Sequence, residues 1–209
     1  MKKYIVFLLI LASLNLMAQS KLSDAERQQI ITKIDLAAKK MQSMQCDFTQ
    51  TKRMKLLKRD MQSCGVMYFK RPDKLRWQYT SPYDYIFTMN GNQVQLKSTR
   101  STQNINVQQN KMFRQITSII LSSITGSSLK SNADFTVELY RKDKSYFARL
   151  YPKKKEIKQI YQSIEIHFNP ALTMVTTVHM LEKTGDETIV RLNNTKTNTT
   201  INENLFSTR

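Results

Sequence analysis

Two stretches of the chain repeat apolar residues at helical spacing, and much of the remainder alternates apolar with polar positions. Ser23 and Glu26 form a capping box before the first stretch, a signal that satisfies free amide groups at a helix N-terminus. The apolar stripe behind it consists of Ile30, Ile34, Ala37, Met41 and Met44. The second stretch, residues 112–126, ends at a glycine and carries Phe113, Ile116, Ile120 and Ile124 on one stripe. Both stretches are typical of amphipathic helices.

Alternation with a period of two predicts strands elsewhere. Apolar residues alternate with polar neighbours at Phe135, Val137 and Leu139, and again at Ile164, Ile166 and Phe168. Asn90-Gly91 accepts the positive φ of a tight hairpin turn, and Asn169-Pro170 precedes another strand over residues 174–181. Because no linker or repeat interrupts this pattern, we expect a single domain over residues 19–209. Its class is α+β: a strongly curved antiparallel sheet with helices over its concave face.

The first 18 residues are typical of a secretory signal peptide. Lys2 and Lys3 supply the positive start, residues 4–17 are apolar, and Ala18 is a small residue for cleavage. The mature chain should begin near Gln19. No cysteine follows the apolar run to accept a lipid anchor, and no later segment has the roughly 20 apolar residues of a transmembrane helix. We therefore expect an exported protein that is released from the membrane.

The formal net charge of +17 is strongly basic. A field of this sign favours phosphate, anionic lipid headgroups, acidic glycans or acidic proteins as partners. Alternatively, the lysines only solvate the surface and guard exposed strand edges. Nucleic acid is not expected as a partner, because an exported chain rarely meets it and no compact nucleic-acid-binding motif is present.

Cys46 and Cys64 lie on a predicted hairpin that turns near Lys55. If the turn is centred there, the two thiols face one another, and an exported protein would keep them as a disulfide. Closing this loop is worth about 3 kcal/mol in the chain-entropy description. A slip of one residue would put the cysteines on opposite faces of the hairpin. The disulfide is therefore predicted only for this register.

No catalytic motif stands out in the sequence. The chain has no HExxH, P-loop, GxSxG or CxxC pattern, and its acidic residues are scattered. With the turn centred at Asn169-Pro170, His167 and His179 would be offset by about five residues, or roughly 16 Å. That separation is too large for a shared metal. We expect no enzymatic activity, no cofactor and no metal, and two solvated histidines.

Residues 65–82 combine a strand that is apolar on both faces, a proline corner and the only tryptophan. Val66 and Tyr68 lie on one face, and Met67 and Phe69 on the other, as expected of a strand covered on both sides. The next residues, Arg71 and Pro72, end the strand, because proline removes a ladder donor.

Arg71 can donate several hydrogen bonds in a fixed fork, for instance to carbonyls left open at a helix or loop end. The alternative is one more surface cation. Trp77 and Tyr79 alternate with polar residues and give the following strand an aromatic face. Those rings either fill the core or line a cavity, and the pattern fits both.

In this region the chain resembles the family of periplasmic outer-membrane lipoprotein carriers, LolA. The resemblance rests on Asp47-Phe-Thr-Gln50 after the first helix, then on Gly65 through Lys70-Arg-Pro72, Leu75, Trp77 and Pro82, then on Asn90-Gly91 and on residues 198–206. It implies an incomplete antiparallel β-barrel closed by helices. The hollow of such a barrel holds the acyl chains of a lipoprotein during its crossing of the periplasm.

The resemblance also implies roles for individual residues. Arg71 would be the latch that bonds the helical lid. The cavity would be formed by Phe48, Tyr68, Leu75, Trp77 and Tyr79, and the lid helix by Phe113, Ile116, Ile120 and Ile124. Methionine, with 11 residues in the chain, suits an irregular acyl pocket, although ordinary core filling explains it equally.

The implied function is a monomeric periplasmic chaperone without enzymatic activity. Its partners would be lipoprotein acyl chains, an inner-membrane lipoprotein-releasing transporter and an outer-membrane acceptor. Two alternatives stay open. The same fold would serve a carrier or sensor of another lipid or glycolipid, and an exported binder of anionic glycans or proteins would also explain the charge.

Overall fold

A computed structural model of the protein describes residues 20–57, 59–109, 111–125, 129 and 134–208. Within these residues, twelve strands form one antiparallel sheet in the order β1-β8-β9-β10-β11-β12-β2-β3-β4-β5-β6-β7. The strands are β1 (Ser20–Lys21), β2 (Ser43–Met54), β3 (Arg59–Lys70), β4 (Lys74–Ser81), β5 (Tyr85–Asn90), β6 (Gln93–Ser98), β7 (Thr102–Asn106), β8 (Phe135–Lys142), β9 (Ser145–Pro152), β10 (Tyr161–Phe168), β11 (Val175–Glu182) and β12 (Glu187–Thr197). The predicted signal peptide, residues 1–18, lies outside the described residues.

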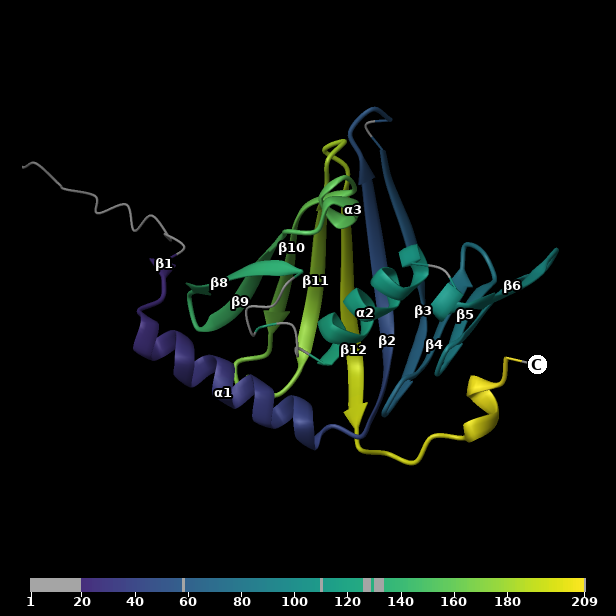
Figure 1. The fold of residues 1–209 in the computed structure, drawn as a ribbon, viewed down its shortest axis with the longest axis horizontal. Helices are drawn as coiled ribbons and strands as arrows, with labels where there is room; N and C mark the ends of the chain where they lie inside the picture. The colour runs from purple at the N-terminus through teal and green to yellow at the C-terminus, as the bar shows by residue number, and fades with distance from the viewer. Residues whose placement is uncertain (1–19, 58, 110, 126–128, 130–133, 209) are drawn as a thin grey trace, which may run out of the picture.

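The sheet consists of two runs of hairpins joined along one seam. Strands β2 to β7 follow one another on one side, and β8 to β12 on the other. The seam is the pairing of β12 with β2, in which Val190 lies opposite Gln50 and Leu192 opposite Phe48. The resulting sheet is strongly curved and open, as predicted, and the helices lie in its hollow (Figure 1).

Three α-helices and two short 3-10 helices complete the described structure. They are α1 (Asp24–Lys40), α2 (Lys111–Thr125), α3 (Lys155–Lys158), η1 (Val107–Gln109) and η3 (Glu203–Phe206). Both predicted helices are present, but the first ends at Lys40, so Met41 of its predicted stripe is the C-cap residue and Met44 lies on β2. The hydroxyl of Ser23 caps α1 by accepting a bond from the amide of Glu26 at 3.4 Å.

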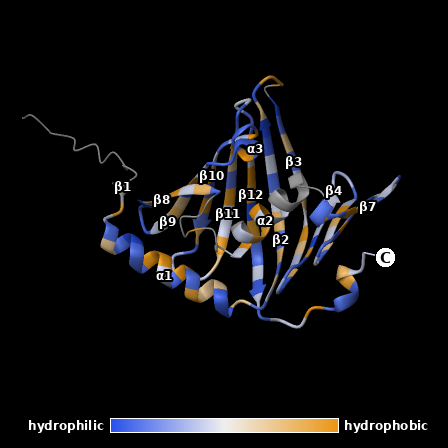
Figure 2. Cartoon of the chain, in the orientation of Figure 1, coloured by the Kyte–Doolittle hydropathy of each residue, from blue (hydrophilic) through white to orange (hydrophobic). Residues whose placement is uncertain are grey.

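Helix α1 runs along one end of the sheet (Figure 1). Its buried face carries Ile30, Ile31, Ile34 and Ala38, and its opposite face is hydrophilic (Figure 2). Near its start, the Arg27 guanidinium donates to the carbonyl of Val137 on β8 at 3.2 Å. Its other end leads directly into β2, so α1 spans the hollow from one half of the sheet to the other.

Gly65 is required where three strands meet. A Cβ at this position would lie 1.9 Å from the carbonyl oxygen of Gln78 and 2.9 Å from the ring of Phe48. The ladder between β3 and β4 also shifts register between Cys64 and Gly65. The missing side chain lets β4 approach closely and lets the Phe48 ring lie over the strand, which is a typical use of glycine in a sheet.

The end of the chain packs on the outer side of the sheet. Phe206 is fully buried, and the carbonyl of Leu205 accepts a bond from Arg76. Glu203 of η3 pairs with Lys70 and Lys74. The amide of Asn198 donates to the carbonyl of Ser43 where the chain turns around the end of the sheet. Residues 198–206 then cover the outer face of β4.

The predicted disulfide is wrong. Cys46 lies opposite Met67, and Cys64 lies opposite Thr49. The turn is therefore centred between Leu56 and Leu57 rather than at Lys55, and the partner of Cys46 is displaced by three residues from Cys64. Because three is odd, the cysteines point to opposite faces of the sheet, and both are free thiols.

We predict that the two thiols differ strongly in reactivity. Cys46 is buried, and that burial, with the charge of Asp47 beside it, raises its pKa to about 12; the thiolate needed for alkylation is therefore scarce. Cys64 is partly exposed. Iodoacetamide should modify Cys64 in the native protein and spare Cys46, as read by peptide mass spectrometry. Both should react equally in denaturant, and a crosslinked 46–64 peptide in unreduced protein would contradict the observed register.

Candidate functional site

An apolar cavity of about 290 Å³ lies between α2 and the concave face of the sheet. Ile119 and Ile120 of α2 form one side of it. The other walls come from six strands and are lined by Gln50, Trp77, Tyr79, Tyr85, Phe87, Tyr161, Met180 and Val190. Because β2, β4 and β5 belong to one half of the sheet and β10, β11 and β12 to the other, the cavity lies across the seam.

An aromatic cluster stiffens the wall on the β4 side. The ring of Phe48 lies 4.7 Å from that of Trp77 and 5.1 Å from that of Tyr79, centroid to centroid. Such pairs contribute about 0.5–1.5 kcal/mol each beyond the area they bury. The hydroxyl of Tyr79 donates to the amide oxygen of Gln50 at 3.0 Å. This bond satisfies a polar group that otherwise opens into an apolar space.

The groups that line the cavity are uncharged at neutral pH. Burial raises the pKa of the Tyr79 phenol, and burial likewise raises the pKa of Tyr85 and of Tyr161. No Lys, Arg, Asp or Glu is among the described residues that line it. An interior of this kind attracts hydrocarbon through area burial and gives no reason for a charged ligand to enter.

A second hollow of about 330 Å³ adjoins the cavity and shares Gln50, Tyr79 and Tyr85 with it. It extends past Met61 on β3 to Pro82 and Tyr83 in the β4–β5 turn. A salt bridge of 3.0 Å between Lys52 and Glu182 stands near the shared boundary. The cavity therefore continues toward the end of the sheet at which the β2–β3 hairpin turns.

Arg71 ties the sheet to the end of α1. Its Nε donates to the carbonyl oxygen of Met41 and its Nη2 to that of Ala38, each at 2.7 Å. Ala38 lies in the last turn of the helix and Met41 is its C-cap residue, a region where carbonyls have few intrahelical donors and carry partial negative charge. The guanidinium fork thus supplies both hydrogen-bond donors and positive charge to this end of the helix.

The sequence family described as outer membrane lipoprotein carrier protein LolA matches residues 39–209. This chain belongs to the LolA family. Solved structures agree on the fold: an uncharacterised conserved protein from Thermus thermophilus is 10% identical, covers 87% of this chain and 92% of its own, and has a TM-score of 0.52.

Two further similar structures are a LolA superfamily protein from Nitrosomonas europaea (12% identity, 87% and 97% coverage, TM-score 0.47) and the Mycobacterium tuberculosis lipoprotein LppX (12% identity, 86% and 99% coverage, TM-score 0.49). Among curated proteins no match is found. The LolA fold is one that binds or carries lipid-linked partners. No helix among the described residues is long and apolar enough to cross a membrane.

Apart from Tyr68 and Arg71, the predicted cavity and lid residues divide into three groups. Trp77, Tyr79 and Ile120 line the cavity. Phe48, Leu75 and Ile124 are at most 3% exposed and belong to the core around it. The side chains of Phe113 and Ile116 lie outside the described residues.

Tyr68 was predicted to line the cavity, and this prediction is wrong. It lies opposite Gln45 and Arg76, on the face of β3 away from Trp77, and it lines a separate outer hollow with Val66 and Lys196. Both faces of β3 are apolar, so the pattern alone does not tell which one faces the hollow.

Arg71 was predicted to bond the lid helix, and within the described residues its helix bonds go to α1 instead. The predicted lid, with Ile120 and Ile124, is α2. The fork at a helix end is present, as the sequence suggested, but the helix is a different one. Its role as a latch stays a prediction.

Several cavity residues were missed. Tyr85 and Phe87 lie directly opposite Tyr79 and Trp77 on β5, and the alternation of two aromatics after the Pro82 turn was a usable signal. Tyr161, Met180 and Val190 come from the other half of the sheet. Nothing local marks these three, because only the seam between β12 and β2 brings them near Trp77.

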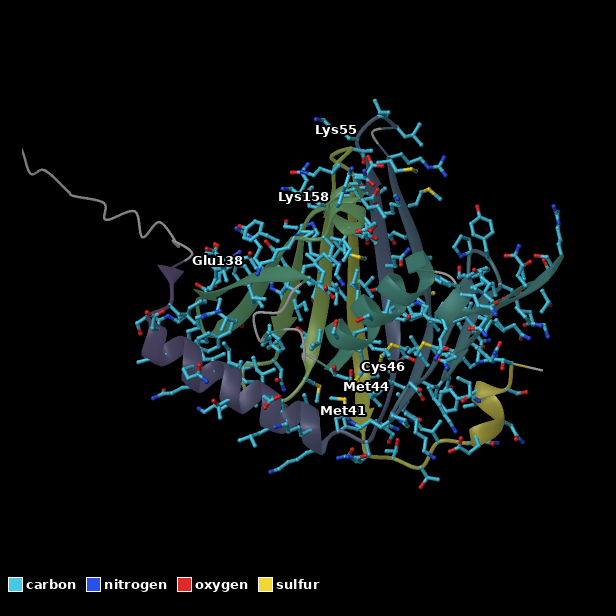
Figure 3. All side chains as sticks on the ribbon, in the orientation of Figure 1. Met41, Met44, Cys46, Lys55, Glu138 and Lys158 are labelled. Carbon is cyan, nitrogen blue, oxygen red and sulfur yellow. The ribbon has the colours of Figure 1, made fainter. Side chains whose placement is uncertain are left out.

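Methionine is used mainly in the core. Met41, Met44, Met67 and Met89 are at most 4% exposed, and only Met180 among the described methionines lines the cavity. Figure 3 shows Met41 and Met44 between the end of α1 and the sheet. Ordinary core filling therefore accounts for these four, of which Met41 and Met44 lie near the Arg71 contact at the end of α1.

The histidine prediction is also wrong. The β10–β11 turn is centred near Leu172, so His179 lies opposite Glu165 rather than far from His167. Both rings approach Glu165 Oε2, His167 at 3.2 Å and His179 at 3.8 Å. Arg149 binds the other oxygen of this carboxylate at 2.7 Å. No group of three or more His, Cys, Asp or Glu in the described structure is placed to hold a metal.

We predict a pH-dependent contribution of Glu165 to stability. The hydrogen bonds from His167 and His179 hold the pKa of Glu165 well below its usual range, and Glu165 raises the pKa of His179. The Glu165 carboxylate contributes to the free energy of unfolding above the unfolded carboxyl pKa of about 4.3. The His179 imidazolium contributes below the unfolded imidazole pKa of about 6.5, and this contribution is lost as pH rises through the raised folded pKa of His179. Glu165→Gln should therefore lower the free energy of unfolding more at pH 5.5 than at pH 8.

Urea unfolding at the two pH values measures this difference. Glu203→Gln is the matched control, because two lysines lower the pKa of Glu203 to about 2 without any histidine. Its effect should be the same at pH 5.5 and pH 8. An equal loss at both pH values for Glu165→Gln would mean that the histidines do not contribute.

Proposed function

We propose that this LolA-family protein holds the acyl chains of a lipoprotein in the cavity under α2. It would carry them through the periplasm from an inner-membrane transporter to an outer-membrane acceptor, without catalysis. The observation that carries the proposal is the uncharged aromatic and aliphatic cavity across the seam of the sheet. Each buried methylene is worth about 0.8 kcal/mol, so acyl chains need such shelter to cross water.

The cavity must expand to hold the proposed cargo. A volume of about 290 Å³ is at the lower limit of pockets for a single small ligand, and a lipoprotein carries several long chains. More room must therefore open when cargo enters. Met41 and Met44 at the end of α1 are the natural source, because unbranched thioether side chains rearrange at little cost.

Arg71 would control this opening. Its two bonds hold the C-terminal end of α1 against the sheet at Met41 and Ala38. When cargo displaces α1, these bonds break, and their return favours the closed form and the expulsion of the cargo. A carrier needs such a reversible polar contact, since cargo held only by a tight apolar pocket would not be released.

The cargo itself tests the proposal. Protein purified from its native periplasm should yield acylated lipopeptides in mass spectrometry. Ile120→Lys should reduce the recovered cargo by at least about tenfold, because an ammonium in an apolar cavity must be neutralised or stay hydrated. Leu36→Lys on α1 is the control, since Leu36 is 52% exposed. A free lipid or glycolipid in place of lipopeptides would overturn the lipoprotein assignment.

Replacing Arg71 by Leu should leave cargo binding intact and slow its release. The closed form loses hydrogen bonds to a charged donor worth about 1.5–3 kcal/mol, a change of roughly 10- to 150-fold in the closing equilibrium. The measurement is transfer of a labelled lipoprotein from purified carrier to outer-membrane acceptor. Arg76→Leu is the matched control, because Arg76 also donates to a backbone carbonyl but on the outer face.

Thermal unfolding of both variants separates release from stability. If Arg71→Leu transfers cargo at the wild-type rate, Arg71 only caps α1, and the latch is wrong even if lipoprotein binding holds.

A further inference from the structure

The β2–β3 hairpin ends in two exposed leucines that the fold does not need. Leu56 is 95% exposed and Leu57 is 62% exposed. They occupy a turn closed by the bond from the Leu57 amide to the Met54 carbonyl at 3.1 Å, where Gly, Asn, Asp or Ser would be the usual choice. The hairpin projects at the top of Figure 1, and its apolar tip is visible in Figure 2.

Three segments meet at this end of the molecule, which we call the apex: residues 52–57 with 59–60, residues 153–160, and residues 181–187. The Lys55 amide donates to Asp186 at 3.0 Å, and the Lys183 amide donates to the carbonyl of Ile160 at 2.8 Å. Figure 3 shows Lys55 and Lys158 at the same end. Ile160 is also exposed, at 43%. The apex is therefore one continuous surface rather than an isolated loop.

The apex is basic as well as apolar. The described residues of its segments include nine Lys or Arg and five Asp or Glu, a net charge of +4. Some cations are paired, as Arg53 is with Asp60 and Glu187, while Lys55, Arg59 and Lys158 have exposed side chains. Apolar side chains at the tip with cations behind them are the arrangement that binds an anionic membrane surface.

The apex also lies on the path to the cavity. Met61, just behind the tip, and Tyr83 in the β4–β5 turn both line the hollow of about 330 Å³, and both are exposed. That hollow shares Gln50, Tyr79 and Tyr85 with the cavity under α2. A surface held against a bilayer here would face the apolar entrance toward the lipid.

We propose that the apex docks on anionic phospholipid bilayers by inserting Leu56 and Leu57, with Lys55 and Arg59 at the headgroup level. The docked protein presents its cavity entrance to the membrane from which, or to which, acyl chains move. This inference rests on the proposed function for its purpose, but the docking itself does not require cargo.

Flotation with vesicles tests the docking. The full mature chain should float with phosphatidylcholine vesicles that contain one quarter phosphatidylglycerol and not with pure phosphatidylcholine, and added salt should weaken the binding because exposed charges are screened. The double variant Leu56→Ser, Leu57→Ser should lower the partition coefficient by about a hundredfold, since each leucine is worth roughly tenfold or more when buried. Leu36→Ser, an exposed leucine on α1, should bind as the wild type.

The basic residues are tested separately. Lys55→Glu with Arg59→Glu should weaken binding to the anionic vesicles by roughly tenfold or more, because each cation near the surface contributes about 1 kcal/mol. Lys142→Glu with Lys144→Glu is the charge-matched control, because these exposed residues lie at the β8–β9 turn, at the opposite ends of the strands.

The outcomes separate this inference from the proposed function. Binding of a fluorescent fatty acid in solution should be unchanged in the leucine variant. If the wild type binds the fatty acid but does not float, or if the leucine variant floats equally well, the docking proposal is wrong. Flotation without fatty-acid binding would support the docking and count against the carrier function. If the leucine variant loses transfer to a purified acceptor and the wild type binds no vesicles, the partner of the apex is a protein. That outcome would overturn the bilayer proposal.

Discussion

The pairing of β12 with β2 is the contact on which the rest of the structure depends. It joins the first long strand after α1 to the last strand of the chain, over Glu187 to Asn193 opposite Arg53 to Asp47. Without it the two runs of hairpins would be separate sheets, each with a second unpaired edge in addition to β1 or β7. With it, they form one curved surface whose inner face is largely apolar. The ends of the sheet do not close on one another, so helices must cover the inner face.

The two long helices cover the inner face in different ways. Helix α1 packs its isoleucines into the core and is tied at its end by Arg71, so this part of the hollow is filled. Helix α2 lies across the seam and leaves space beneath Ile119 and Ile120. The difference between filled core and open cavity therefore follows from how closely each helix approaches the same sheet.

The charged contacts are placed at the boundaries of the apolar hollow, and the polar side chains of Gln50 and Tyr79, which line it, bond one another. Arg71 bonds the end of α1, Lys52 and Glu182 pair near the entrance, and Gln50 satisfies the phenol of Tyr79. Inside a low-dielectric space an unpaired polar group would be costly. At the boundary, such bonds exchange with water at small net cost, which suits a structure that must open and close. The Glu165 cluster on the outer face is a different case, because its charges stabilise the sheet without contact with the cavity.

The sequence by itself determined the local elements and the family, whereas tertiary structure alone decided register, face and long-range proximity. The capping box at Ser23, the helical stripe ending at Thr125, the Asn90-Gly91 hairpin and the arginine before Pro72 depend on neighbours a few residues away, and all were predicted. By contrast, the β2–β3 turn separates Cys46 from Cys64, and the β10–β11 turn brings His179 to Glu165. Tyr68 and Phe69 are both apolar, so only the packing of α1 and of residues 198–206 on opposite sides of the sheet decides which one faces inward. A turn that shifts by a few residues costs little locally, and its consequences appear only when distant strands must fit one another.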